Sequence, residues 1–239
     1  MPISSSGHLV LLHRLFGFKE AQLAFDIFLH LATILSVLVF FAKDISDILT
    51  RDRKMMALII LACISTFAIG LLFRHHVERL FADPTAVGYV LIVTGIWLVS
   101  AHMIYRRVKS PHEVTLKDSV LIGIAQGIAV VPGISRSGAT IGAGMALGVE
   151  GQRAVKFSFL LSVPAVLGAS VVKCMDIKNG LTAAGSSVFI SGGIAAFFTG
   201  LAAIYLLLKM VKANKLWAFG AYCIIAGAVT VYIDRKSVV

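Results

Sequence analysis

Charged side chains are scarce in this sequence. They make up 14% of the 239 positions, whereas hydrophobic residues make up 58%. A soluble globular domain is typically about one quarter charged and about half apolar. The scarcity of charge therefore excludes an ordinary soluble domain. No linker or low-complexity segment divides the chain, and we expect a single membrane domain over residues 1–239.

Cysteine is also rare, and a charged leader is missing. The three cysteines, Cys63, Cys174 and Cys223, are isolated and lie in or beside apolar stretches. Their number and spacing exclude a disulfide framework and a cysteine metal site. The first residues carry no positive charge before an apolar stretch, so a cleavable signal peptide is not expected.

Long apolar runs dominate what is present. A helix needs about 20 apolar residues to cross about 30 Å of hydrocarbon, and it satisfies its own backbone hydrogen bonds there. Six runs have this character. They are residues 22–42, 55–73, 86–104, 154–172, 183–208 and 216–233. The composition thus predicts an all-α polytopic membrane protein.

The net charge is +10, and the basic residues lie between the apolar runs. Segments 43–54 and 105–117 each hold four Lys or Arg residues, whereas 74–85 holds two. Cytoplasmic loops of membrane proteins are enriched in Lys and Arg. This alternation places 43–54 and 105–117 in the cytoplasm, and it explains the basic charge without a nucleic-acid partner.

Segment 118–148 differs from the six runs because polar residues and Pro132-Gly133 interrupt it. Non-helical backbone at membrane depth is tolerated where protein buries it or where it lines a wet cavity. We predict a re-entrant pair of short helices with a turn at residues 133–138. The numbers of Lys and Arg residues inside and outside differ little between a re-entrant pair and a full crossing. The charge distribution therefore does not decide between these two topologies.

The start of the chain resembles this turn. Residues 2–7 read PISSSG and residues 132–138 read PGISRSG. Matching interrupted segments in two halves of a membrane protein indicate a site between inverted repeats. The pattern predicts an inverted repeat with two re-entrant hairpins, the first of them at residues 1–18 and incomplete.

Arg136 is the residue of this turn that most needs an explanation. An arginine at mid-bilayer costs about 2.5–3.5 kcal/mol on insertion scales. No Asp or Glu occurs between Ser119 and Val149, so a neutralising acid is not local. A bound phosphate would compensate, because the guanidinium fork can hold two of its oxygens. The alternative is a structural arginine paired with a carboxylate of another helix.

The residues around Arg136 favour the phosphate. Gly133 and Gly138 allow backbone N–H groups to approach an anion, and the return helix directs its positive dipole end at the turn. Ser135, Ser137 and Thr140 add hydroxyl donors on the same rim. Together these residues predict a phosphate-binding turn.

The first break carries a second set of candidates. Its polar members are Ser4, Ser5, Ser6, Gly7 and His8. A hydroxyl beside an imidazole can act as an activated nucleophile, or both groups can position a water molecule. Further along, Asp26 and His30 are four residues apart and share one helix face. They are candidates for groups that support the site, and capping of the helix end by Asp26 is the alternative.

Four blocks of the sequence resemble one family. PISSSGHLVLL, FDIFLHLATILSVLVFF, AQGIAVVPGISRSGATIGAGMALG and FSFLLSVP occur in that order, and the chain is similar to undecaprenyl-diphosphate phosphatases of the bacitracin-resistance type. The resemblance implies a multi-pass enzyme of the bacterial inner membrane. Such an enzyme removes the terminal phosphate of undecaprenyl diphosphate, recycles the lipid carrier of peptidoglycan synthesis and confers bacitracin resistance. A homodimer is left open.

The resemblance also implies roles for single residues. Ser5 and His8 fall on the nucleophile or proton-transfer positions, with their division of labour open, and Arg136 falls on the phosphate clamp. Ser4, Ser6, Gly7, Gly133, Ser135, Ser137, Gly138 and Thr140 fall on the phosphate-binding blocks.

One element of the family pattern is missing. The family carries Glu-x-x-x-Glu just before the first block, a pair thought to hold a divalent cation such as Mg or Ca, and this sequence starts at Met1. We expect a truncated start, no identifiable metal ligands in this chain and impaired activity until the upstream segment is restored.

Two rival functions are consistent with the sequence alone. Inverted repeats with broken helices also build secondary transporters, and a lipid flippase is a related possibility. A purely structural membrane scaffold would leave Arg136 unexplained.

Overall fold

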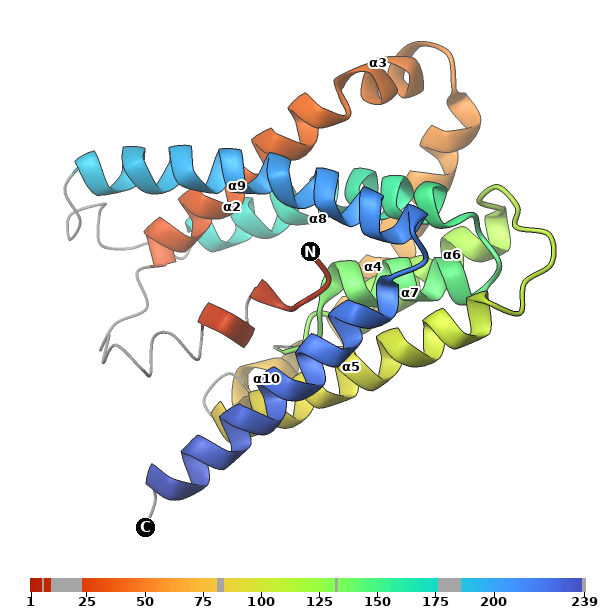
Figure 1. Ribbon diagram of the computed structural model, residues 1–239. Helices are drawn as coiled ribbons and strands as arrows, with labels where there is room; N and C mark the ends of the chain where they lie inside the picture. The colour runs from red at the N-terminus through yellow and green to blue at the C-terminus, as the bar shows by residue number, and fades with distance from the viewer. Residues whose placement is uncertain (6, 10–22, 81–83, 132, 176–185, 238–239) are drawn as a thin grey trace.

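The computed structural model describes residues 1–5, 7–9, 23–80, 84–131, 133–175 and 186–237. Within these ranges the elements of secondary structure are α-helices, and no β-strand is present (Figure 1). The helices are α2 (Leu23–Phe40), α3 (Ala42–Thr50), α4 (Arg53–Leu80), α5 (Pro84–Tyr105), α6 (Leu116–Ile128), α7 (Arg136–Ala146), α8 (Gly151–Met175), α9 (Ser186–Lys212) and α10 (Leu216–Ser237). The predicted all-α fold is confirmed.

Each of the six apolar runs coincides with a helix: α2, α4, α5, α8, α9 or α10. In the described part of the chain, four helices are long and apolar enough to cross a membrane, namely α4, α5, α8 and α9. Helix α2 forms a fifth candidate together with α3, from which it is bent by 73°. The apolar part of α10, Leu216–Tyr232, is shorter. The chain is thus a multi-pass membrane protein.

The basic connection 43–54 contains a helix of its own, α3. Its sequence, AKDISDILT, alternates apolar and polar residues at helical spacing, and it buries Ile48. Lys156 on α8 forms an ion pair with Asp44 of α3. Helix α3 is therefore fastened to the bundle by an apolar face and a charged contact.

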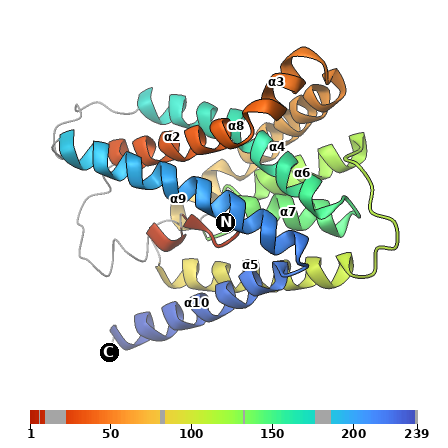
Figure 2. The same cartoon turned by 45° about the horizontal axis from the view of Figure 1, so that its top comes forward.

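The helices form two groups with a hairpin between them (Figures 1 and 2). Helices α5 and α10 run side by side, and α2 lies along α9 and α8. Helices α6 and α7 pack on one another, with α4 against α6 and α5 against α7. The first residues of the chain lie near the centre, beside α7. The candidate site lies at this central position, where the first residues of the chain meet α7.

Two pairs of glycines bring α5 and α10 together. The carbonyl oxygen of Gly95 would lie 2.7 Å from a Cβ on Gly220, and that of Gly88 would lie 2.5 Å from a Cβ on Gly227. No side chain fits between the backbones at these points. Small residues of this kind allow helices to approach closely in a membrane, where packing rather than water drives association. Helix α5 is thereby held rigidly enough to support the turn before α7.

The two ends of the α6–α7 hairpin lie side by side. His112, just before α6, pairs with Val149, just after α7, in a parallel β-bridge. Helix α6 has 13 residues and α7 has 11, which correspond to about 20 Å and about 17 Å at 1.5 Å per residue. Each is shorter than the roughly 30 Å of hydrocarbon in a bilayer.

His112 fastens the two ends of the hairpin in a pH-dependent manner. Its Nδ1 lies 2.8 Å from the carbonyl oxygen of Glu113 and its Nε2 lies 3.2 Å from that of Leu147. Carbonyl oxygens only accept hydrogen bonds, so the imidazolium alone satisfies both. The hydrogen bond to Glu113 raises the pKa of His112 above its ordinary 6.5, and the hydrogen bond to Leu147 and the charge of Asp118 at 3.7 Å act in the same direction.

We expect His112→Gln to destabilise the protein more at pH 5.5 than at pH 8.5. A raised pKa stabilises the folded state fully below the ordinary value, and this stability is lost as the pH rises through the folded-state value. The measurement is thermal unfolding in detergent at both pH values, with Lys109→Gln in the same loop as the control. An equal loss of stability at both pH values would show that the charge of His112 is irrelevant.

Candidate active site

The turn between α6 and α7 is shaped by backbone and hydroxyl contacts. Gly133 has φ +91°, a left-handed conformation that side chains rarely adopt. Its carbonyl oxygen accepts a hydrogen bond from Thr94 on α5 at 3.1 Å. Ser135 then starts α7, because its Oγ accepts from the backbone N–H of Gly138 at 3.1 Å. The turn is thus fixed to α5 at one end and capped at the other.

The first motif repeats this local arrangement. The Oγ of Ser4 accepts from the backbone N–H of Gly7 at 3.3 Å, as Ser135 does from Gly138. The resemblance between PISSSG and PGISRSG therefore corresponds to the same serine-to-glycine hydrogen bond in both segments. The backbones differ at the serine itself, because Ser4 has φ +59° and Ser135 has φ −74°.

The two motifs also touch. Ser137 donates a hydrogen bond to the carbonyl oxygen of Met1 at 3.0 Å. A Cβ on Gly7 would lie 3.5 Å from the Cα of Gly133, and one on Gly138 would lie 3.5 Å from the Cβ of Pro2. The structure therefore brings together the two segments that the sequence pattern predicted to share a site.

His8 is held at both ring nitrogens. Its Nδ1 lies 2.8 Å from the carbonyl oxygen of Ser4, and its Nε2 lies 2.7 Å from the hydroxyl of Tyr222 on α10. The two rings are nearly parallel, with an interplanar angle of 8° and centroids 5.7 Å apart. A half-buried imidazole with two fixed partners is suited to proton transfer.

Arg136 is the first residue of α7 and its side chain is exposed in the isolated chain. Among the residues that the structure describes, its guanidinium has no ion pair and no hydrogen-bond partner. The described part of the chain thus does not provide the fixed carboxylate of the alternative interpretation. A cation at the positive end of a helix, in an apolar setting, favours a bound anion.

Two predicted hydroxyls are engaged inside the protein. Thr140 is buried. Its Oγ1 lies 2.9 Å from the carbonyl oxygen of Arg136, to which it can donate, and 2.5 Å from the hydroxyl of Ser158 on α8, where either oxygen can be the donor. Ser135 is buried as the cap of α7. The carbonyl oxygen of Gly138 accepts from Trp97 at 3.3 Å. In this state, these groups orient the start of α7, and direct phosphate contacts by Ser135 and Thr140 stay predictions.

The structure describes only some of the remaining predicted site residues. Ser5 is exposed at the first helical position of the N-terminal segment. Ser6 and the side chain of Asp26 lie outside the described residues. His30 is half-buried on α2, a helix that packs on α9 and α8. The supporting role of Asp26 and His30 stays a prediction.

The described residues do not fit a divalent cation. Hard cations are bound by several oxygen ligands, largely carboxylates. Within the described ranges, no three side chains of His, Cys, Asp or Glu come together in a group that could hold a metal ion.

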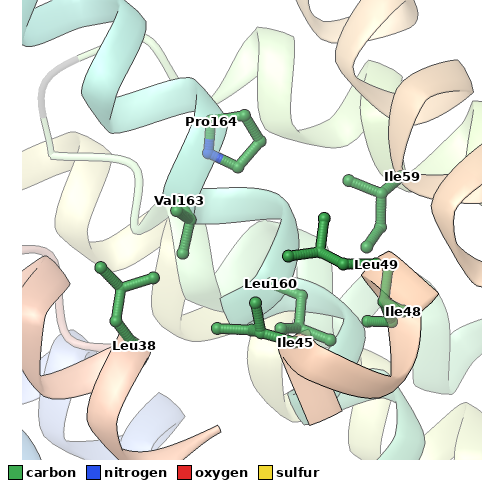
Figure 3. Close-up of a pocket in the computed structure, with 8 residues that line it drawn as sticks. All are labelled: Leu38, Ile45, Ile48, Leu49, Ile59, Leu160, Val163 and Pro164. Atoms are coloured by element: carbon green, nitrogen blue, oxygen red, sulfur yellow. The ribbon is translucent and has the colours of Figure 1, made fainter. Parts of the chain in front are cut away.

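A pocket elsewhere in the bundle does not suit a phosphate. It lies beneath the bend between α2 and α3 and is lined by Leu38, Ile45, Ile48, Leu49, Ile59, Leu160, Val163 and Pro164 (Figure 3). All of these side chains are apolar, so the pocket offers no group to compensate a buried charge.

Sequence reasoning missed four side chains that build the site. They are Thr94 and Trp97 on α5, Ser158 on α8 and Tyr222 on α10. Thr94, Trp97 and Tyr222 lie in apolar runs without a motif around them. Ser158 falls within the block FSFLLSVP, which carried the family resemblance but no role.

The chain is similar to known proteins of one family over nearly its whole length. The profile of the family described as bacitracin resistance protein BacA matches residues 1–229. An undecaprenyl-diphosphatase of Halothermothrix orenii is 38% identical over 237 residues, which cover 98% of this chain and 92% of that protein. The undecaprenyl-diphosphatase of Carboxydothermus hydrogenoformans is 39% identical over 233 residues, covering 95% and 88%. That of Methanosphaera stadtmanae is 38% identical over 262 residues, covering 98% and 92%.

Proposed function

Because this chain belongs to the BacA family of bacitracin resistance proteins, we propose that it hydrolyses undecaprenyl diphosphate to undecaprenyl phosphate and phosphate. The relatives described above carry the name undecaprenyl-diphosphatase. The observation that carries the proposal is Arg136, which starts α7 without a partner in the described chain, beside the motif that holds His8.

The reaction transfers a phosphoryl group to water. The bond between the terminal phosphorus and the bridging oxygen breaks, and a bond from the water oxygen to that phosphorus forms. Charge spreads over the phosphoryl oxygens in the transition state, so positioning and electrostatic stabilisation supply most of the catalysis. A site for this chemistry needs fixed donors for the oxygens and a group that takes up the water proton.

The donors come from the start of α7. The Arg136 guanidinium holds the terminal phosphate, and the positive end of the helix dipole faces the same oxygens. The buried contacts of Ser135, Thr140 and Ser158 keep this helix end in place before substrate arrives. Preorganised donors of this kind stabilise developing charge without reorganising during the reaction.

The proton is handled by the N-terminal motif. Two divisions of labour fit the geometry: Ser5 attacks phosphorus while His8 accepts its proton, or His8 accepts the proton of an attacking water that Ser5 positions. In the first case a phosphoseryl intermediate forms and water hydrolyses it. Ser5 is exposed and His8 is half-buried, so both are accessible to an incoming head group.

A divalent cation, Mg or Ca, remains part of the proposal through the family resemblance alone. The described residues supply no donor set for it, and no step of the reaction above is derived through it. Release of phosphate after removal of divalent ions by a chelator, and after their return, measures the requirement.

We also propose the membrane arrangement. The meeting of the start of α6 with the end of α7 supports a re-entrant hairpin over residues 118–148. The reciprocal glycine pairs of α5 and α10, together with the two serine-to-glycine turns, support an inverted repeat. The enzyme would lie in the cytoplasmic (inner) membrane and recycle the lipid carrier for peptidoglycan synthesis, and bacitracin resistance follows from removal of the diphosphate. A homodimer is a further proposal, which cross-linking in membranes would test.

The test of function is phosphate release from undecaprenyl diphosphate in detergent, measured with the purified chain and with a version extended upstream by the family's Glu-x-x-x-Glu segment, which we expect to be the more active of the two. We expect one phosphate per lipid and undecaprenyl monophosphate as the other product. Proteoliposome uptake of the labelled lipid, measured in parallel, separates hydrolysis from the transporter or flippase alternative, which the comparisons do not support. Uptake without phosphate release would overturn the proposal.

A further inference from the structure

Within the described residues, the side chain of Tyr222 is the one from outside the N-terminal motif that forms a hydrogen bond with His8. It belongs to α10, which is packed tightly against α5 along the glycine pairs. The hydroxyl-to-Nε2 distance of 2.7 Å is that of a good hydrogen bond. The phenol is therefore presented to His8 from a rigid element.

The contacts of the ring determine where its hydrogen lies. The carbonyl oxygen of Ser4 can only accept, so Nδ1 carries the hydrogen and donates it over 2.8 Å. In the neutral imidazole, Nε2 is then the basic nitrogen, and the Tyr222 hydroxyl donates to it. After Nε2 gains a proton, the same hydroxyl can turn and accept, because a phenol both donates and accepts.

We propose that Tyr222 fixes the His8 imidazole in the Nδ1–H tautomer and relays the reacting proton to its basic Nε2. This inference rests on the proposed function. The proton balance is closed: Nε2 takes the phenol hydrogen, and the phenol oxygen takes the hydrogen of the attacking water or of Ser5. The chain is reversed when the leaving oxygen or the product is protonated.

The first experiment is a double-mutant cycle on phosphate release. Tyr222→Phe keeps the ring and removes the hydroxyl, and we expect kcat to fall about tenfold with KM within about twofold of the wild type. In the His8→Ala background, Tyr222→Phe should cause no further loss, because the two residues act as a unit. The matched control is Tyr205→Phe on α9, an exposed tyrosine, which should leave kcat unchanged.

The second experiment does not depend on activity. Nitrogen-15 NMR of histidine-labelled protein in detergent, with His8 assigned from its absence in His8→Ala, reports the tautomer directly. We expect the Nδ1–H form in the wild type and a displaced Nε2 resonance in Tyr222→Phe, whose lost hydrogen bond is the cause.

The outcomes separate the two proposals. If neither the chain nor its upstream-extended version releases phosphate, but the Nδ1–H tautomer and the Tyr222-dependent Nε2 resonance are observed, the proposed function is overturned and the inference is kept. An active wild type with an unchanged kcat in Tyr222→Phe would overturn the inference. An equal loss of kcat in both backgrounds would also overturn it, since that is the signature of a general packing role.

Discussion

Replacing Arg136 by alanine is expected to lower kcat for phosphate release by about a thousandfold. The guanidinium stabilises charge that develops on the phosphoryl oxygens, and donors or arginines of this type contribute about 10²–10⁵-fold to such reactions. The structure adds a reason to expect no compensating damage to the fold, because Arg136 holds no ion pair within the described chain. The measurement is kcat in detergent beside the thermal stability of the same sample.

The control for this result is Arg107→Ala, which removes one exposed positive charge from the loop after α5. It should leave kcat near the wild-type value. Arg136→Lys should recover part of the activity, because lysine restores the charge without the two-oxygen fork. Near-normal turnover in Arg136→Ala would remove the phosphate clamp from the site.

Gly133→Ala is expected to abolish most activity by destabilising the turn before α7. A side chain at φ +91° costs about 1–2 kcal/mol. The new Cβ would also lie 2.9 Å from the Cβ of Val90 on α5, and overpacking of this kind costs about 1–3 kcal/mol. Both effects act where Arg136 is oriented, so kcat and the free energy of unfolding should fall together.

Gly168→Ala provides the matched control. Gly168 is an exposed residue of α8, and a Cβ there would meet no atom within 4 Å. Alanine in a helix is favoured over glycine by about 1 kcal/mol, so this variant should be at least as stable as the wild type. If Gly133→Ala matched it in stability and turnover, the left-handed turn would have no functional importance.

The fold was largely predictable because the membrane imposes a single dominant constraint. A run such as 86–104 must be helical to satisfy its backbone in lipid, and it lies within α5. The interruption at Gly133 was visible for the same reason. The helix α3 was not predicted, because its short amphipathic pattern resembles an ordinary charged loop until it packs on α8.

The site could be predicted only at residues whose burial in an apolar segment costs free energy. Arg136 stood out because a cation in an apolar segment requires a partner. Tyr222 did not, because a tyrosine in an apolar helix needs no special explanation. The phosphate contacts of Ser135 and Thr140 stay predictions, but the sequence did not indicate the hydrogen bonds that their hydroxyls make within the protein, to Gly138, Arg136 and Ser158. Sequence shows that a hydroxyl is present, and tertiary contacts decide which partner it finds.

The contact between His8 and Tyr222 joins residues 214 positions apart. During synthesis, His8 and the helices up to α9 enter the membrane before Tyr222 has been made. A nascent chain arrested after α9 would carry Arg136 and His8 yet still lack a fixed proton acceptor. Turnover should therefore be acquired late in biogenesis, when the final helix docks.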